Sequence, residues 1–400
     1  MKHTTKQWGV AIVSLLMAIL FCACATSGKP AAPTGPRPFD AAVEEVTERL
    51  LSAVAEDRGG FFDVGQAEVV IEPFADPISG EVPRVSREIE QKMIQAGTAR
   101  HPSFKITRLS TETLETADYL IRGAIHPDTS PSSRTPDRKR YRLRASVRNL
   151  REVRVLGTAE VPITDSDLDY APTPAYRDNP FYLSSELGDA RPAGSMDAGT
   201  GDEAVSLRLR AHLSEAESAY DEGDYTEALR LFEDALRLEG GRTLRTYAGI
   251  YMANRKLGQG PAAAAAFQEM VALSVERYNQ LAVKFLFAVN SAELKPDADL
   301  EAQYDLWLRM IGRYFQETDR CLEIVGHSSR TGAEAWNRTL SLKRAENIRN
   351  MLKATFPDVQ RRSRAVGMGF QENIVGIGTD DDRDALDRRV EIIPIDCRDM

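Results

Sequence analysis

A serine beside a histidine, in the run His327-Ser328-Ser329-Arg330, is the arrangement in this 400-residue chain that could support nucleophilic catalysis. The strained turn that exposes a catalytic serine requires Gly two residues after it, and Arg330 stands at that place after Ser328. The chain also lacks the His-Glu-x-x-His zinc motif, the phosphate-binding loop and the glycine motif for dinucleotides. We therefore expect a protein that is not an enzyme and that needs no cofactor.

Four aspartates that stand close together could hold a calcium ion; they are Asp380, Asp381, Asp382 and Asp384. A calcium-binding EF-hand loop also requires Gly at its sixth position and Glu at its twelfth, and the sequence does not meet this pattern. We expect a solvated loop there and no metal site.

Two cysteines near the C-terminus could form a disulfide. Cys321 begins one expected strand, and Cys397 follows the last one. If these two strands pair antiparallel, the two cysteines can bond in an oxidising compartment. Two free thiols stay the alternative, because the sequence does not give the separation of the Cα atoms.

The first 23 residues have the three parts of a secretory signal peptide: two lysines, an uncharged apolar run over residues 8–21, and small residues after it. The run is shorter than the roughly 20 residues that a membrane-spanning helix needs. Phe21-Cys22-Ala23-Cys24 resembles the bacterial lipobox. This resemblance implies acylation of Cys24, with palmitate or a similar chain, and a lipoprotein of the outer membrane that faces the periplasm. An ordinary cleaved signal peptide is the alternative. Residues 24–38, rich in Pro, Gly and Ala, would then link the lipid to the folded part.

The composition is that of a protein with several globular domains. Lys and Arg number 51 against 60 Asp and Glu, for a net charge of −9, and 42% of the residues are hydrophobic. A general nucleic-acid binder normally carries an overall basic footprint, so we expect no nucleic-acid partner.

Residues 39–165 are expected to fold as an α/β domain with a mixed sheet. Helical spacing of apolar residues predicts helices near 41–56 and 85–93, and apolar or alternating runs predict strands at 67–74, 104–109, 117–125, 140–148 and 153–163. With the runs VVIEPFAD and ADYLIRG, this order resembles the periplasmic α/β domain of LpoB, FlgO and the core of CsgG. The resemblance implies a protein-interaction role and transfers no catalytic residue.

One part of this domain is basic although the chain is acidic. From Arg134 to Arg154 there are nine basic residues and two acidic ones, and arginines alternate with apolar residues over 140–148. The basic face has two interpretations: a docking surface for an anionic partner of the envelope, or the solvated outer face of a half-buried strand.

Residues 166–204, rich in Asp, Pro, Gly and Ser, are expected to be a linker or a loosely ordered segment wrapped on the fold. Over residues 205–277 a glycine, an alanine and a phenylalanine recur at an offset of 35 residues, at Gly223, Ala228 and Phe232 and again at Gly258, Ala263 and Phe267. The pattern resembles two tetratricopeptide (TPR) repeats, which implies helical hairpins that serve as a peptide-binding surface or as a spacer. Three repeats are the usual minimum for stability, so we expect the pair to pack against the helix that leads into the next domain.

Residues 278–397 are expected to fold as a C-terminal βαβαββ domain. The runs predict strands at 282–289, 321–327, 361–370 and 388–395 and helices at 298–315 and 338–356. The fold class is therefore multidomain, with two α/β domains and an all-helical part between them.

Six ordered motifs of this last region resemble the OmpA-like peptidoglycan-binding domain of OmpA, Pal and MotB; they are FAVNSAELKP, GHSSRTG, Asn337, LSLKRA, GMG and DRRVE. The resemblance implies that the domain grips the diaminopimelate of the peptidoglycan stem peptide without cutting it. An Arg of the family, here Arg344, binds the carboxylate as a planar fork. The family's Asp that binds the ammonium is replaced by Ser329. The matching motifs also place Asn290, Asn337 and Arg388 among the expected binding residues.

Loss of that aspartate leaves three interpretations: a weakened site, a site rescued by a carboxylate from Asp380 to Asp387, or a domain that serves another glycan or protein ligand. A charge-assisted hydrogen bond contributes about 1.5 to 3 kcal/mol, so its loss could weaken binding roughly tenfold to a hundredfold. We favour retained affinity for the cell wall.

The sequence thus predicts a non-catalytic outer-membrane lipoprotein that binds peptidoglycan non-covalently and recruits envelope proteins through its TPR-like and N-terminal parts. The alternative is an accessory component of an outer-membrane secretion or motility assembly.

Overall fold

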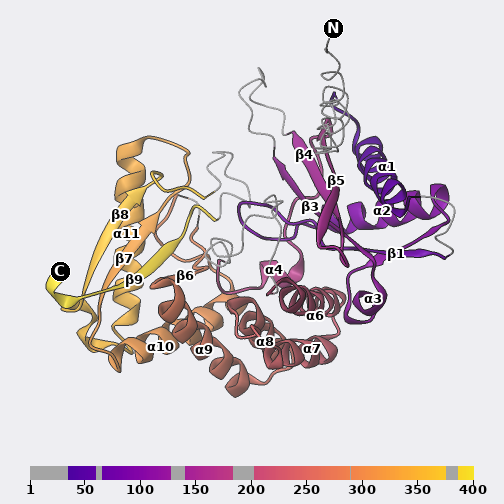
Figure 1. The fold of residues 1–400 in the computed structure, drawn as a ribbon. Helices are drawn as coiled ribbons and strands as arrows, with labels where there is room; N and C mark the ends of the chain where they lie inside the picture. The colour runs from indigo at the N-terminus through magenta and orange to yellow at the C-terminus, as the bar shows by residue number, and fades with distance from the viewer. Residues whose placement is uncertain (1–34, 60–64, 128–139, 183–201, 289, 375–385) are drawn as a thin grey trace, which may run out of the picture. The chain divides into compact units, whose positions relative to one another are not determined.

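The computed structural model describes residues 35–59, 65–127, 140–182, 202–288, 290–374 and 386–400 (Figure 1). The predicted signal peptide, Cys24, the first part of the tether, the aspartates at 380–384 and the start of the basic stretch at 134–139 lie outside these residues. In the described part of the chain, no helix is both long and apolar enough to cross a membrane.

The N-terminal part is a five-stranded mixed sheet with the strand order β2-β1-β3-β4-β5. Strand β1 pairs in parallel with β2 and β3, whereas β3, β4 and β5 pair antiparallel. Helix α1 packs on β4 and β5 and also against α2. The elements are α1 (Phe39–Arg58), β1 (Ala67–Ile71), α2 (Val85–Arg100), β2 (Phe104–Arg108), α3 (Thr111–Thr116), β3 (Tyr119–Pro127), β4 (Tyr141–Asn149) and β5 (Arg154–Ile163).

In strand β4, the alternation of apolar residues and arginines in the sequence corresponds to one buried face and one more polar face. Its apolar residues Tyr141, Leu143, Ala145 and Val147 are all buried, because side chains of a strand point alternately to opposite faces. On the other face of β4, the arginines are partly engaged in contacts with the protein rather than all pointing freely into solvent. Arg142 and Arg144 both form ion pairs with Glu160 of β5, and Arg148 is buried.

The first half of the predicted linker is instead packed. It contains the short helix α4 (Pro174–Arg177), and the side chains of Ala175, Tyr176, Phe181 and Tyr182 are buried. The backbone N–H of Tyr182 donates to the carbonyl of Ala282, at 2.9 Å. Of the two predictions, this half agrees with a segment wrapped on the fold, because aromatic residues in a Pro-rich and Asp-rich run anchor it to the helices and to the C-terminal sheet.

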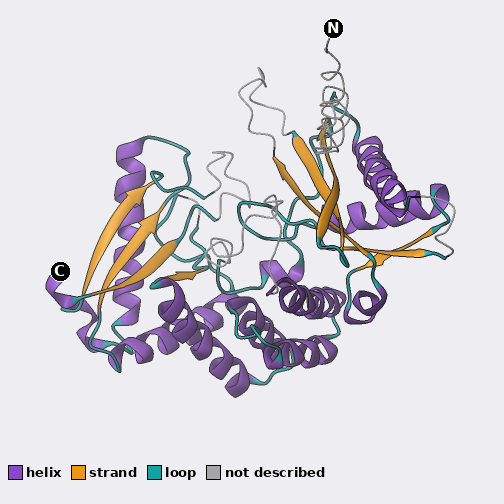
Figure 2. Ribbon diagram, in the orientation of Figure 1, coloured by secondary structure: helices purple, strands orange, loops and turns teal. Residues whose placement is uncertain are grey.

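Residues 202–278 form helices α6 (Asp202–Glu222), α7 (Tyr225–Arg237), α8 (Leu244–Lys256) and α9 (Gly260–Tyr278), as Figure 2 shows. The turns after α6 and α8 contain the recurring glycines, with φ of +87° at Gly223 and +73° at Gly258. A side chain at Gly249 would lie 2.3 Å from the ring of Phe232, so this glycine lets α7 and α8 approach closely. The elements are thus two helical hairpins, and their identity as TPR repeats stays a prediction.

The C-terminal part is a four-stranded mixed sheet with the order β6-β9-β7-β8. Strands β7 and β8 are parallel, and β9 runs antiparallel between β6 and β7. Helix α11 packs on β7 and β8. The elements are β6 (Leu281–Val283), α10 (Ala298–Gln316), β7 (Cys321–His327), α11 (Glu334–Leu352), the 3-10 turn η1 (Pro357–Gln360), β8 (Ser363–Gly369), β9 (Val390–Ile395) and η3 (Cys397–Asp399).

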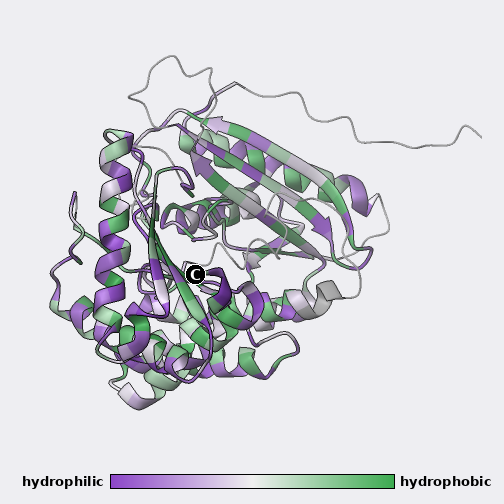
Figure 3. Cartoon of the chain, turned by 90° about the vertical axis from the view of Figure 1, so that its left-hand side faces the viewer, coloured by the Kyte–Doolittle hydropathy of each residue, from purple (hydrophilic) through white to green (hydrophobic). Residues whose placement is uncertain are grey.

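The order of these elements agrees with the predicted βαβαββ pattern, but the first strand is shorter than predicted. Strand β6 ends at Val283, because the next backbone N–H, that of Lys284, donates to Pro180 rather than to a sheet neighbour. Figure 3 shows hydrophilic and hydrophobic residues interleaved along the helices and strands, as expected of elements with one buried face.

The helical hairpins and the C-terminal sheet share one hydrophobic core. The ring of Phe267 on α9 stacks on Trp307 of α10 with centroids 5.9 Å apart, and the indole N–H of Trp307 donates to the hydroxyl of Tyr251 on α8, at 2.7 Å. The hairpin pair thus packs against a neighbour as predicted, but that neighbour is α10, which lies within the next domain after its first strand and does not lead into it.

Candidate functional site

The candidate site lies at the carboxyl end of β7, where two glycines allow helix α11 to rest directly on the sheet. A Cβ added at Gly326 would lie 1.9 Å from the carbonyl oxygen of Ser341, and one at Gly367 would lie 2.6 Å from the carbonyl oxygen of Arg338. Only glycine permits this approach, which fixes α11 against the turn that follows β7.

Arg344 of α11 joins two segments that surround this turn. Its Nε donates to the carbonyl of Ser291, at 3.1 Å, and its Nη1 donates to the carbonyl of His327, at 3.2 Å. Its guanidinium carbon lies 5.1 Å from the centroid of the Phe287 ring. Arg344 is 1% exposed, so it links the 290–293 loop to the end of β7 from a buried position.

The 290–293 loop is held by a second side chain of α11 that the sequence reasoning did not single out. Asn347 donates from Nδ2 to the carbonyl of Ala292, at 2.8 Å. Asn347 stands three residues after Arg344, and residues at that spacing share a helix face. The loop begins at Asn290, which is exposed and has a φ of +53°.

Ser329 and Asn337 lie in and beside the turn after β7. The hydroxyl of Ser329 lies 3.3 Å from that of Thr331, and Asn337 donates from Nδ2 to the carbonyl of Thr331, at 2.7 Å. Both residues are buried. The structure therefore brings Ser329, Asn337 and Arg344 to the two sides of one turn.

The segment before β9 borders the other side of the turn. Arg388 is half-buried, and Asp387 is fully buried and accepts a hydrogen bond from the backbone N–H of Ile374, at 2.6 Å. One carboxylate oxygen of Asp387 is thus already bonded to the backbone of Ile374. The other aspartates that could replace the missing family aspartate, Asp380 to Asp384, lie outside the described residues.

A buried charged group lies beneath the site. Glu391 of β9 accepts from Nε of Arg389 at 2.5 Å, and its other oxygen lies 3.6 Å from Nε2 of the fully buried His327. Burial acts to raise the pKa of the Glu391 carboxyl, but His327 and Arg389 outweigh it and lower that pKa from 4.5 to about 2. Glu391, His327 and Arg389 thus form a buried charged cluster where β7 ends and β9 begins.

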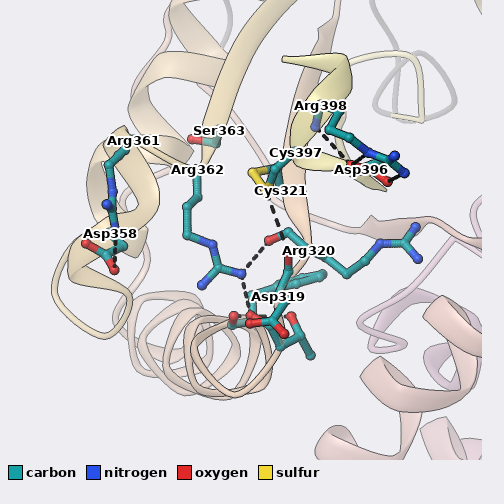
Figure 4. Close-up of a disulfide and its surroundings, with 12 residues drawn as sticks. Asp319, Arg320, Cys321, Asp358, Arg361, Arg362, Ser363, Asp396, Cys397 and Arg398 are labelled. Atoms are coloured by element: carbon teal, nitrogen blue, oxygen red, sulfur yellow. Dashed lines mark hydrogen bonds and ion pairs between the residues drawn. A yellow bond between two sulfur atoms is a disulfide. The ribbon is translucent and has the colours of Figure 1, made fainter.

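Cys321 and Cys397 are joined by a disulfide whose Cα atoms lie 4.9 Å apart (Figure 4). Strands β7 and β9 pair antiparallel, which brings the start of β7 beside the end of β9. The disulfide lies at the start of β7, whereas the candidate site lies at its end. Among the described residues there is no cluster of three or more His, Cys, Asp and Glu side chains that could hold a metal ion.

Comparison with known proteins identifies this part of the chain. Residues 286–386 match the sequence model of the OmpA family, so the C-terminal domain is OmpA-like. A search of curated proteins finds no match.

Similar solved structures include the peptidoglycan-associated lipoprotein from Burkholderia pseudomallei, with 24% identity over 28% of this chain and 88% of that chain and a TM-score of 0.25. The cell wall anchor of the T6SS from Pseudomonas aeruginosa is 22% identical over 33% of this chain and 96% of that one, with a TM-score of 0.25. The periplasmic domain of Helicobacter pylori MotB is 17% identical over 29% of this chain and 70% of that one, with a TM-score of 0.23.

Proposed function

We propose that this protein binds peptidoglycan non-covalently, without cleaving it, through the turn after β7 of its OmpA-like domain. The observation that carries the proposal is the match of residues 286–386 to the OmpA family, together with the position of Arg344 inside that range. The resemblance of LSLKRA to the family motif assigns Arg344 to the carboxylate of the stem peptide. A guanidinium suits that task because its planar fork matches a carboxylate.

Binding at Arg344 requires a local rearrangement. The side chain is 1% exposed, and its Nε donates to the carbonyl of Ser291. A carboxylate that binds Nε of Arg344 therefore has to displace the carbonyl of Ser291, so the 290–293 loop must shift. The hydrogen bond of Asn347 to Ala292 restrains the same loop, so these two side chains together set how readily the site opens.

Ser329 makes the proposed affinity lower than that of a site with an aspartate. A serine hydroxyl offers one hydrogen bond to an ammonium but no charge. Arg330, next to it and exposed, adds a positive charge that opposes an ammonium. We therefore propose an affinity for diaminopimelate peptidoglycan that is roughly tenfold to a hundredfold weaker than that of a complete site.

We further propose that Cys24 carries a lipid anchor in the outer membrane and that the N-terminal domain and helical hairpins bind envelope proteins. The lipobox-like run supports the first part, since two or more acyl chains hold a protein stably on a membrane. Membrane fractionation tests it: the protein should move from the outer-membrane fraction to the soluble periplasmic fraction in a Cys24→Ser variant that is still exported. Retention of this variant in the membrane would contradict the lipid anchor.

Co-sedimentation with purified sacculi tests the peptidoglycan proposal. The wild type should sediment with sacculi, and Arg344→Lys, which keeps the charge but loses the fork, should be retained at least tenfold less. Lys343→Gln is the matched control, because Lys343 is the exposed neighbour of Arg344 on the same helix.

The control for folding is circular dichroism of each variant, since Arg344 is buried. Equal retention of the wild type and a folded Arg344→Lys variant would remove the proposed site.

A further inference from the structure

A cavity of about 560 Å³ lies where the 171–182 segment, helices α6 and α8 and the 284–303 segment meet. Cavities of this size suit a small ligand, and they occur preferentially where separate parts of a fold meet. Four buried aromatic side chains line it: Tyr182 of the 171–182 segment, Tyr220 of α6, Tyr251 of α8 and Trp307 of α10.

The charged side chains around the cavity are more often basic than acidic. Lys284 forms an ion pair with Glu81, at 2.8 Å, and Lys256 with Asp178, at 3.0 Å. Arg255 of α8 and Lys295 of the 284–303 segment also line the cavity. Two further carboxylates, those of Asp297 and Asp299, belong to the lining, and Asp297 accepts from the backbone N–H of Leu300 at the start of α10. The lining thus has six cationic and four anionic side chains, an excess of two positive charges. An aromatic floor with an excess of positive charge favours a ligand that has carboxylates and an apolar body.

The cavity shares a loop with the candidate site. Leu286 and Lys295 line the cavity and are joined by a backbone hydrogen bond of 2.8 Å from the N–H of Lys295 to the carbonyl of Leu286. Between them, Phe287 contacts the guanidinium of Arg344, and Ser291 accepts from it. An occupant of the cavity would therefore contact the base of the same loop that must move for Arg344 to bind a carboxylate.

We propose that this cavity binds a short acidic peptide, with its carboxylates at Arg255 and Lys295 and its apolar part against the aromatic floor. The enclosed volume is too small for a folded partner, and a free phosphate would leave the aromatic floor uncovered. The shared loop identifies the peptide as the stem peptide of the cell wall, held at a second subsite. This identification of the source rests on the proposed function, whereas the acidic-peptide chemistry does not.

Fluorescence titration of the soluble full-length chain, exported and carrying Cys24→Ser, tests the proposal. Trp307 lines the cavity, and a Trp336→Phe background removes the exposed tryptophan of α11. The probe is the tripeptide L-Ala-γ-D-Glu-diaminopimelate with free carboxylates, and its fully amidated form is the comparison. The free tripeptide should give saturable quenching, and Arg255→Gln and Lys295→Gln should each raise its dissociation constant about tenfold, whereas Lys343→Gln should not.

The outcomes separate this inference from the proposed function. Arg344→Lys should lower sacculus retention at least tenfold and leave the fluorescence titration unchanged. Saturable binding without any sacculus retention would support the acidic-peptide site and remove its assignment to the cell wall. The proposal is overturned if the amidated tripeptide binds as tightly as the free one, if the Arg255 and Lys295 variants bind like the wild type, or if no saturable binding occurs up to millimolar tripeptide.

Discussion

Glu391 should make the stability of the OmpA-like domain depend on pH. Its carboxylate is paired with Arg389 and lies 3.6 Å from His327, and its pKa in the folded protein is about 2 against an ordinary value of 4.5. Because the folded protein binds this proton more weakly than the unfolded chain, the ionised carboxylate stabilises the fold. That stabilisation is complete above pH 4.5 and is lost as the pH falls through about 2.

The difference between the two pKa values gives the size of the effect. At about 1.36 kcal/mol for each pH unit, Glu391 contributes about 3 kcal/mol to the free energy of unfolding at pH 7 and about half of that at pH 3. A Glu391→Gln variant should therefore be destabilised at pH 7, where it also leaves the buried Arg389 without its carboxylate. The gap between wild type and variant should shrink by about half on going to pH 3.

Urea unfolding followed by tryptophan fluorescence measures this gap. Two tryptophans remain after removal of the predicted signal peptide: Trp307 on α10 and Trp336 on α11. Both helices belong to the C-terminal domain, so the fluorescence reports on the unfolding of that domain. Glu346→Gln is the control, because Glu346 is exposed on α11. A wild-type-to-variant gap that stays constant between pH 7 and pH 3, or a Glu391→Gln variant as stable as wild type at pH 7, would refute the reasoning.

Three further changes have defined outcomes. Ser329→Asp should raise retention on diaminopimelate-containing sacculi about tenfold, measured by co-sedimentation, because it supplies a charge for the ammonium; unchanged or lower retention would mean that the site prefers another ligand. Gly326→Ala should destabilise the domain by about 3 kcal/mol or more in urea unfolding, because the added Cβ meets the backbone of Ser341 at 1.9 Å; a stable variant would show that α11 can shift. The Cys321→Ser, Cys397→Ser double variant should lose about 4 kcal/mol, since the disulfide closes a loop of 76 residues in the unfolded chain, and an unchanged urea midpoint would contradict this.

The local patterns of the sequence predicted elements well wherever one face of an element is buried. Tyr141, Leu143, Ala145 and Val147 alternate with polar residues because only their face meets the core, and strand β4 follows. Ser329 lies just after the end of β7, and Asn337 and Arg344 lie on α11, while their part in binding stays a prediction.

Features that depend on contacts between distant segments could not be predicted. The segment around Tyr176 and Phe181 has the composition of a linker, and its burial depends on helices that follow it in the chain. Asn347 is recognisable only once the carbonyl of Ala292 is known to lie beside it. The burial of Arg344 and the cavity beside Trp307 follow from the packing of several elements, which no single run of residues encodes.

The core shared by the hairpins and the OmpA-like domain has a mechanical consequence. Phe267 stacks on Trp307, and Trp307 is hydrogen-bonded to Tyr251, so α8, α9 and α10 are joined by side chains as well as by the chain itself. Under the proposed function, a pull on the candidate site would pass directly into α9 and α8, because the chain around residue 278 is not a flexible connection between two separate cores.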